Sequence, residues 1–194
     1  MAVAKRICLI DAHPHAGRHF CHALADAYEA GARGAGHAVA RVNLAELDIP
    51  LLRDPADFQT APPPELEAPR EAVRAAQHLC IIYPLWLGTM PAAMKAFFEQ
   101  FARANFAIAP SEKGWPQRML AGRSARVVVT MGMPAAAYRL FFQAHGVKGF
   151  ESAVLGMAGF KPIRETLLGM VEAAGEEKRA SWLKRMQDLG AKAI

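Results

Sequence analysis

Short apolar runs alternate along the chain with longer segments in which apolar residues recur every three or four positions. The first pattern is typical of buried β-strands and the second of amphipathic helices. Strands are predicted at 7–10, 37–44, 80–83, 125–130 and 163–171, and helices at 20–34, 69–77, 91–104, 138–145, 150–160 and from 176 onward. This alternation predicts an α/β fold with a parallel sheet in a single domain, 1–194.

The segment after the third strand is apolar where a surface turn is usually polar. The strand breaks at Pro84, and the loop that follows carries Trp86 ahead of Gly88. Open α/β sheets bind ligands at the carboxyl ends of their strands, so a flat apolar ligand such as a flavin ring would suit this loop. Alternatively, Trp86 and Leu87 pack against a neighbouring helix or a second subunit.

The loop after the first strand, 11–19, is polar and rich in cationic side chains. It leads into a helix, whose N-terminus favours an anion. The G-x-x-x-x-G-K-[ST] and G-x-G-x-x-G patterns are both absent, so a phosphate here would be held by a different kind of loop. The alternative is that His13, His15 and His19 are solvated loop residues.

Further loops lie before and after the fourth strand. Residues 131–134 form another strand-end loop, and 105–123 predicts a long loop near the site. Tyr138, Phe141, Phe142 and His145 lie at helical spacing, and the two phenylalanines can be interpreted as core residues. Segment 48–69 is rich in proline and predicts a surface excursion with one short helix.

The composition argues against a membrane protein, a nucleic-acid-binding protein and a metalloprotein. No apolar run approaches the roughly 18 residues that span a bilayer, and no signal peptide is apparent, which predicts a cytoplasmic protein without membrane insertion. The net charge of +5 is dispersed, which argues against a nucleic-acid interface. Three cysteines without C-x-x-C spacing predict reduced thiols, and the histidines form no H-x-x-x-H or H-x-H set on a helix face, so no metal site is expected.

Three motifs, in this order, resemble the NAD(P)H:quinone oxidoreductase family. They are Ala12-His13-Pro14 with Arg18-His19-Phe20-Cys21, then the segment from Tyr83 to Pro91, then Thr130-Met131-Gly132 with Tyr138 and His145. The resemblance implies an α/β, flavodoxin-like fold: a doubly wound five-stranded parallel sheet with helices on both faces. It also implies a flavin-dependent enzyme whose sites are completed in a homodimer.

The resemblance also implies a role for each motif. The flavin phosphate would be surrounded by His13, Arg18, His19, Phe20 and Cys21; the ring would be lined by Pro84, Leu85, Trp86, Leu87 and Gly88; and the pyrimidine edge would be held by Thr130, Met131, Gly132 and Met133. Tyr138 and His145 would stabilise negative charge on the ring during hydride transfer. The chain departs from the family in having His19-Phe20-Cys21 for Ser-Phe-Asn, Met131-Gly132-Met133 for Thr-Gly-Gly, and one extra residue between Tyr138 and His145.

The expected function is hydride transfer from NAD(P)H to a quinone or similar acceptor. FMN is favoured over FAD because no adenosine-binding motif is recognisable. The alternative is a flavin-binding regulatory subunit of a membrane transport protein; a flavodoxin-type electron carrier is disfavoured because the chain is cationic. A homodimer is further indicated because the aromatic residues Phe97, Phe98, Phe101, Phe106, Phe141 and Phe142 exceed the evident needs of one core.

Overall fold

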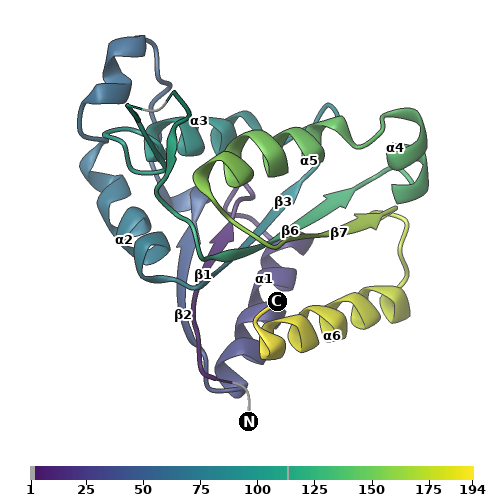
Figure 1. Ribbon diagram of the computed structural model, residues 1–194. Coiled ribbons are helices and arrows are strands. Elements are labelled where there is room, and N and C mark those ends of the chain that lie inside the picture. The colour runs from purple at the N-terminus through teal and green to yellow at the C-terminus, as the bar shows by residue number, and fades with distance from the viewer. Residues whose placement is uncertain (1–2, 113) are drawn as a thin grey trace.

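A computed structural model of the protein describes residues 3–112 and 114–194. At its centre is a five-stranded parallel sheet with the order β2-β1-β3-β6-β7 (Figure 1). Its strands are β1 (Arg6–Asp11), β2 (Ala38–Asn43), β3 (His78–Pro84), β6 (Ser124–Met131) and β7 (Ile163–Gly169). The predicted flavodoxin-like, doubly wound sheet is confirmed. Its strand order reverses between β1 and β3, which is where such sheets bind ligands.

Strand β3 is the most deeply buried strand of the sheet. All seven of its residues are buried, because β1 and β6 flank it and helices cover both faces. A strand buried on both faces becomes a continuous apolar run instead of an alternating pattern. This is why 80–83 could be identified as a strand from the sequence.

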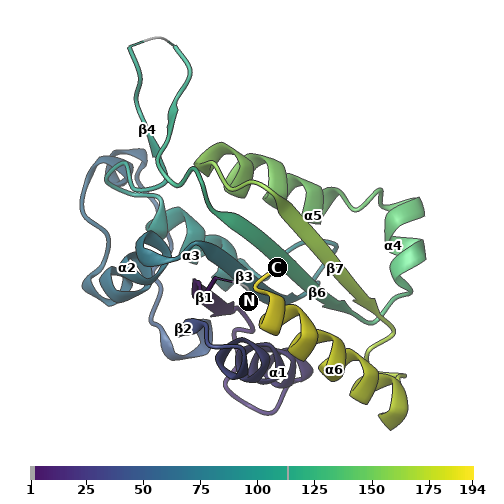
Figure 2. The same ribbon diagram turned by 60° about the horizontal axis from the view of Figure 1, so that its bottom comes forward.

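The helices form one layer on each face of the sheet (Figure 2). One layer contains α1 (Phe20–Gly34) and α6 (Glu176–Lys192); the other contains α2 (Glu67–Ala75), α3 (Ala92–Phe101) and α5 (His145–Gly149). Helices α1 and α6 pack closely through glycines. A Cβ added at Gly31 would lie 1.9 Å from the Gln187 oxygen, and one at Gly190 would lie 2.0 Å from the Tyr28 oxygen. This packing holds the start of α6 near the start of α1.

Two expectations about aromatic residues are wrong. Phe97, Phe98, Phe101 and Phe106 are all buried in the core, so a single domain does use them inside. Phe141 and Phe142 are not core residues, because their side chains are 81% and 51% exposed. Helix α4 (Ala135–Phe141) buries only Tyr138, so most of its surface faces outward.

Segment 105–123 differs from its prediction. It forms an antiparallel hairpin of β4 (Ile108–Ala109) and β5 (Gln117–Arg118), with residue 113 outside the described part. The hairpin leaves the body at the amino ends of the strands, because Ala107 and Leu120 pack beside Leu79 at the start of β3 (Figure 2). Within this chain it therefore lies away from the carboxyl-end loops, and the expectation of a loop near the site is wrong.

The remaining segments add short helices. The predicted surface excursion, 48–69, contains the 3₁₀ segments η2 (Pro55–Gln59) and η3 (Pro64–Leu66), and a further one, η1 (Leu44–Glu46), precedes it. The predicted helix at 150–160 is the π-helix η4 (Phe150–Gly156), which continues directly from α5. Among the described residues, no helix is long and apolar enough to cross a membrane.

Candidate functional site

Strand register brings the ligand-facing loops together. Pro84, the last residue of β3, lies opposite Thr130 of β6, and Asp11, the last residue of β1, lies opposite Ile82. The Leu85 amide donates a hydrogen bond of 2.7 Å to the Thr130 carbonyl, which extends the pairing into the loop. The loops after β1, β3 and β6 consequently meet at one edge of the sheet.

A cavity of about 460 Å³ opens between these loops. It is lined by His13, His15, Arg18, His19, Phe20, Cys21, Pro84, Trp86, Thr130, Val171, Glu172 and Arg179. The structure therefore brings together eight of the residues singled out from the sequence: His13, Arg18, His19, Phe20, Cys21, Pro84, Trp86 and Thr130. They come from three separate loops, as the strand-end pattern predicted.

Other predicted residues lie beside this cavity and do not line it. Leu85, Leu87 and Gly88 belong to the turn after β3, and Met131 and Met133 bond through their carbonyls to the Val171 and Met170 amides. Gly132 faces Glu172, whose Oε2 would lie 2.6 Å from an added Cβ.

The sequence reasoning assigned no role to Val171, Glu172 or Arg179, and treated His15 only as a loop residue. Val171 and Glu172 follow the fifth strand at its carboxyl end, so the rule that located the other loops could have found them. Arg179 lies in the second turn of α6. It reaches the cavity because α6 packs on α1, an arrangement that no local pattern encodes.

The loop before α1 provides the cationic end of the cavity. His19 occupies the N-cap position of the helix and makes no side-chain capping bond to the backbone. Arg18 is exposed and has no ion-pair partner among the described residues, while Arg179 bonds only backbone carbonyls and lies over the Phe20 ring. Two uncompensated guanidinium groups beside a helix N-terminus favour a bound anion.

Imidazole rings crowd the same loop. The His13 and His19 rings are stacked with their centroids 3.7 Å apart, and His19 Nε2 lies 2.9 Å from His15 Nδ1. Burial, followed by the neighbouring histidines, lowers the pKa of both His13 and His19. These two rings are therefore neutral at pH 7, and the arginines carry the positive charge. Among the described residues no group of His, Cys, Asp and Glu is arranged to hold a metal ion.

The apolar wall of the cavity is held by a tight turn. Trp86 and Thr89 exchange backbone hydrogen bonds of 2.9 and 3.0 Å, and the two residues between them, Leu87 and Gly88, have φ of 48° and 79°. Left-handed conformations at both central positions are those of a type I′ turn, in which glycine costs least. The turn leaves the Trp86 indole 47% exposed, beside the His13 ring.

Tyr138 is fully buried behind this turn. Its hydroxyl donates to the Gly88 carbonyl at 2.9 Å and accepts from the Val147 amide at 3.3 Å. Gly146 packs against the same turn, since an added Cβ would lie 2.2 Å from the Gly88 oxygen. His145 is exposed at the first position of α5. The charge-stabilising roles of Tyr138 and His145 stay predictions, and in this structure the Tyr138 hydroxyl ties the turn to α4 and α5.

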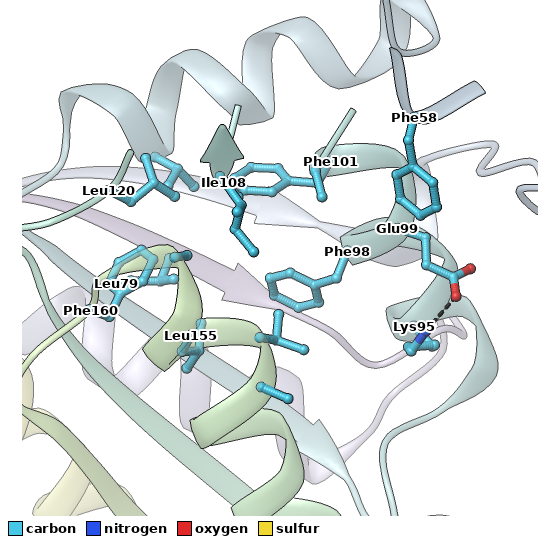
Figure 3. Close-up of a pocket in the computed structure, with 16 residues that line it drawn as sticks. Phe58, Leu79, Lys95, Phe98, Glu99, Phe101, Ile108, Leu120, Leu155 and Phe160 are labelled. Atoms are coloured by element: carbon cyan, nitrogen blue, oxygen red, sulfur yellow. Dashed lines mark hydrogen bonds and ion pairs between the residues drawn. The ribbon is translucent and has the colours of Figure 1, made fainter. Parts of the chain in front are cut away.

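A second cavity of about 270 Å³ lies elsewhere and is almost entirely apolar (Figure 3). Leu79, Leu120 and Phe160 line it from the amino ends of the strands, and Phe98 and Leu155 line it from α3 and η4. Among the described residues that line it, the charged ones are Lys95 and Glu99, which form an ion pair with each other. Because the Lys95 ammonium is already paired with Glu99 and the rest of the lining is apolar, this cavity does not suit the phosphate of a flavin nucleotide.

The first cavity, in contrast, suits flavin mononucleotide. The α1 N-terminus, Arg18 and Arg179 would hold the phosphate, and Pro84 and Trp86 offer a flat apolar wall to the ring. Thr130 lies between these two ends, with its Oγ1 3.2 Å from Cys21 Sγ. Burial raises the pKa of that thiol to about 12, so Cys21 adds no negative charge beside the phosphate.

Comparison with known proteins places the chain in a family. Residues 5–189 match the family model described as the flavodoxin-like fold. A curated relative, FMN-dependent NADH:quinone oxidoreductase 1 of Hahella chejuensis (strain KCTC 2396), is 34% identical over 94 residues, which are 48% of this chain and 43% of that protein. The chain thus aligns with less than half the length of this relative.

Two solved structures share the whole architecture. Smu.1420 from Streptococcus mutans UA159 is 24% identical with a TM-score of 0.81, and the alignment covers 97% of this chain and 99% of that one. The NAD(P)H:quinone oxidoreductase from Methanothermobacter marburgensis is 20% identical with a TM-score of 0.78, covering 99% and 100%. Together with the match over residues 5–189, these similarities show that the chain belongs to the family of proteins with the flavodoxin-like fold.

Proposed function

We propose that this protein is a flavin-dependent oxidoreductase that binds FMN and transfers hydride from NAD(P)H to a quinone or similar acceptor. One observation carries the proposal: a single cavity joins an anion-binding helix N-terminus to an exposed indole at the strand ends. Such a cavity is complementary in shape and charge to a ligand with a phosphate at one end and a flat ring at the other. The partial match to an FMN-dependent NADH:quinone oxidoreductase supports the same cofactor and reaction.

The bound FMN supplies the redox chemistry, since its ring can accept hydride and pass it on. The chain supplies placement. Arg18 and Arg179 neutralise the phosphate, and Trp86 and Pro84 shield one part of the ring from water. Backbone amides of the turn at Leu87 and Gly88 are available to the ring edge, since neither has a hydrogen-bond partner among the described residues. Charge stabilisation by Tyr138 and His145 is the remaining part of this proposal.

A homodimer is also part of the proposal. Leu87 of the turn, Leu140 and Phe141 of α4, and Phe142 just after it are exposed apolar side chains, and Tyr138 ties α4 to that turn. Gathered apolar side chains on a surface are typical of protein interfaces. A second copy covering them would also enclose the open side of the flavin ring.

The test begins with the purified protein. Flavin is released by acid, identified by chromatography, and the same preparation is assayed with NADH and NADPH in the presence of a quinone. Bound FMN with quinone-dependent oxidation of one nicotinamide is expected. Tight FMN with negligible turnover would favour the regulatory-subunit alternative, and failure to bind added FMN would refute the proposal.

A further inference from the structure

His22 lies in the first turn of α1 and connects two elements of the proposed phosphate site. Its Nδ1 is 2.7 Å from Asp11 Oδ2 at the end of β1, and its Nε2 is 3.0 Å from the His15 carbonyl oxygen in the loop. His22 does not line the flavin cavity itself. With Arg18, His19 and Arg179 it lines an adjoining cavity of about 620 Å³, and its bond to the His15 carbonyl holds the loop that carries Arg18 and His19.

The chemistry of the two partners determines the charge of the ring. A carboxylate and a carbonyl oxygen only accept hydrogen bonds, so both ring nitrogens of His22 must donate. A histidine ring donates from both nitrogens only when both carry a proton, so His22 is an imidazolium cation. By contrast, His15 Nδ1 accepts a hydrogen bond of 3.0 Å from the Gly17 amide, as a neutral ring does.

The surroundings of Asp11 favour a positive charge on the His22 ring. Asp11 is 1% exposed, and its Oδ2 also accepts a bond of 2.7 Å from Arg41, while Oδ1 has no partner among the described residues. A buried carboxylate requires compensating positive charge. If His22 lost its proton, Arg41 alone would compensate Asp11.

We propose that His22, as an imidazolium, is a positioning residue that clamps the phosphate loop to β1 and thereby couples FMN binding to a proton. This rests on the proposed function, since it concerns the site assigned to the FMN phosphate. The proton would sit on a residue that does not line the cavity assigned to the flavin.

The direction of the pH dependence follows from the environment of His22. Partial burial lowers its pKa, but the bonds to Asp11 and the His15 carbonyl outweigh burial and leave the pKa above its ordinary value of about 6.5. A group with a raised folded-state pKa contributes fully at low pH, and its contribution is lost as the pH rises through that pKa. Loss of the His22 proton would break the bond between Asp11 and the residue that holds the loop, so FMN binding should weaken as the pH rises from about 6.5 through the pKa of His22.

Other titratable and charged groups surround His22. Those that face it or share its surroundings are Asp11 of β1, Arg41 of β2, His13, His15, Arg18 and His19 of the loop, Asp26 of α1, Glu46 after β2 and Arg179 of α6. The pKa values of His13 and His19 are lowered, so these rings lose any proton at lower pH. The second ionisation of a phosphate, near about pH 6, strengthens binding as pH rises and thus acts in the opposite direction.

The experiment measures FMN affinity by fluorescence quenching between about pH 6.5 and 8.5. In the unaltered protein the dissociation constant should rise at least about tenfold, the lower end of the value of one charge-assisted hydrogen bond. His22→Asn keeps an amide nitrogen near the Nδ1 position and His22→Gln keeps one near the Nε2 position, and neither titrates. Both variants should lose the pH dependence, and His22→Gln, which keeps the loop contact, should bind FMN more tightly than His22→Asn.

His37→Asn is the matched control. His37 Nδ1 accepts from the Lys5 amide and its Nε2 donates to the Ala191 carbonyl, so that ring is neutral and remote from the loop. The control should keep the pH dependence of the unaltered protein. An affinity that is constant with pH in the unaltered protein, or a full pH dependence in the two His22 variants, would overturn the proposal.

Ring ¹⁵N chemical shifts give a readout that is independent of the cofactor. In the flavin-free protein at about pH 6.5, both His22 nitrogens should carry protons, and the signals should titrate above that value. A neutral tautomer at this pH would overturn the clamp. If the imidazolium is found but FMN does not bind, the clamp stands as a property of the loop and the proposed cofactor is refuted.

Discussion

Replacing Tyr138 by phenylalanine removes one hydroxyl that joins three elements. The hydroxyl bonds the Gly88 carbonyl of the ring-facing turn and the Val147 amide of α5, and Tyr138 itself lies on α4. Gly88 is partly exposed, so the loss at its carbonyl is expected to be the smaller of the two. The Val147 amide is buried and would lose its partner.

The cost can be estimated from these two contacts. Leaving one buried donor unsatisfied costs about 1 to 3 kcal/mol, and the bond to Val147, at 3.3 Å, is long enough to favour the lower end. For a chain of this length each kcal/mol lowers the melting temperature by about 2 to 4 °C. Tyr138→Phe should therefore melt about 2 to 12 °C below the unaltered protein.

Tyr83→Phe provides the matched control. Tyr83 is as deeply buried on β3, but its hydroxyl has no hydrogen-bond partner among the described residues. Removing an unpaired buried hydroxyl should leave the melting temperature unchanged or raise it. Differential scanning fluorimetry of both variants measures this contrast.

Flavin kinetics separate the two roles of Tyr138. If its hydroxyl mainly holds the turn, melting temperature and flavin content fall together in Tyr138→Phe. If it stabilises charge on the ring, reduction by NAD(P)H per bound flavin slows by about tenfold to a hundredfold, as expected for one such bond. An unchanged melting temperature in Tyr138→Phe would refute the reasoning from the buried Val147 amide.

Three further outcomes are expected. Gly146→Ala should destabilise the fold by about 1 to 3 kcal/mol in denaturant titration, because its Cβ would lie 2.2 Å from the Gly88 oxygen; full stability would contradict this packing. Arg18→Glu should lower the FMN retained after desalting, whereas Arg53→Glu, the same charge change on the surface excursion, should not; equal retention would contradict the phosphate placement. Sedimentation at micromolar concentration should show a dimer, and a single 21 kDa species would count against the proposed interface.

The sequence by itself determined the elements of the fold and the loops that matter. The strand at 80–83 is apolar throughout because it is buried on both faces, and the helix at 20–34 keeps its 3.6-residue period because one face packs on the sheet. Parallel strands place their carboxyl ends at one edge, so Arg18, Trp86 and Thr130 could be assigned to one site before their contacts were known.

Only the tertiary structure decided how these residues are used. The clamp formed by Asp11, His22 and Arg41 joins three elements, and Arg179 enters the site through the packing of α6 on α1. Helical spacing at Tyr138, Phe141 and Phe142 could not show which side chains face inward, because that depends on what a short helix packs against. Local patterns encode the period of an element, whereas hydrogen-bond partners and burial arise from contacts between residues distant in sequence.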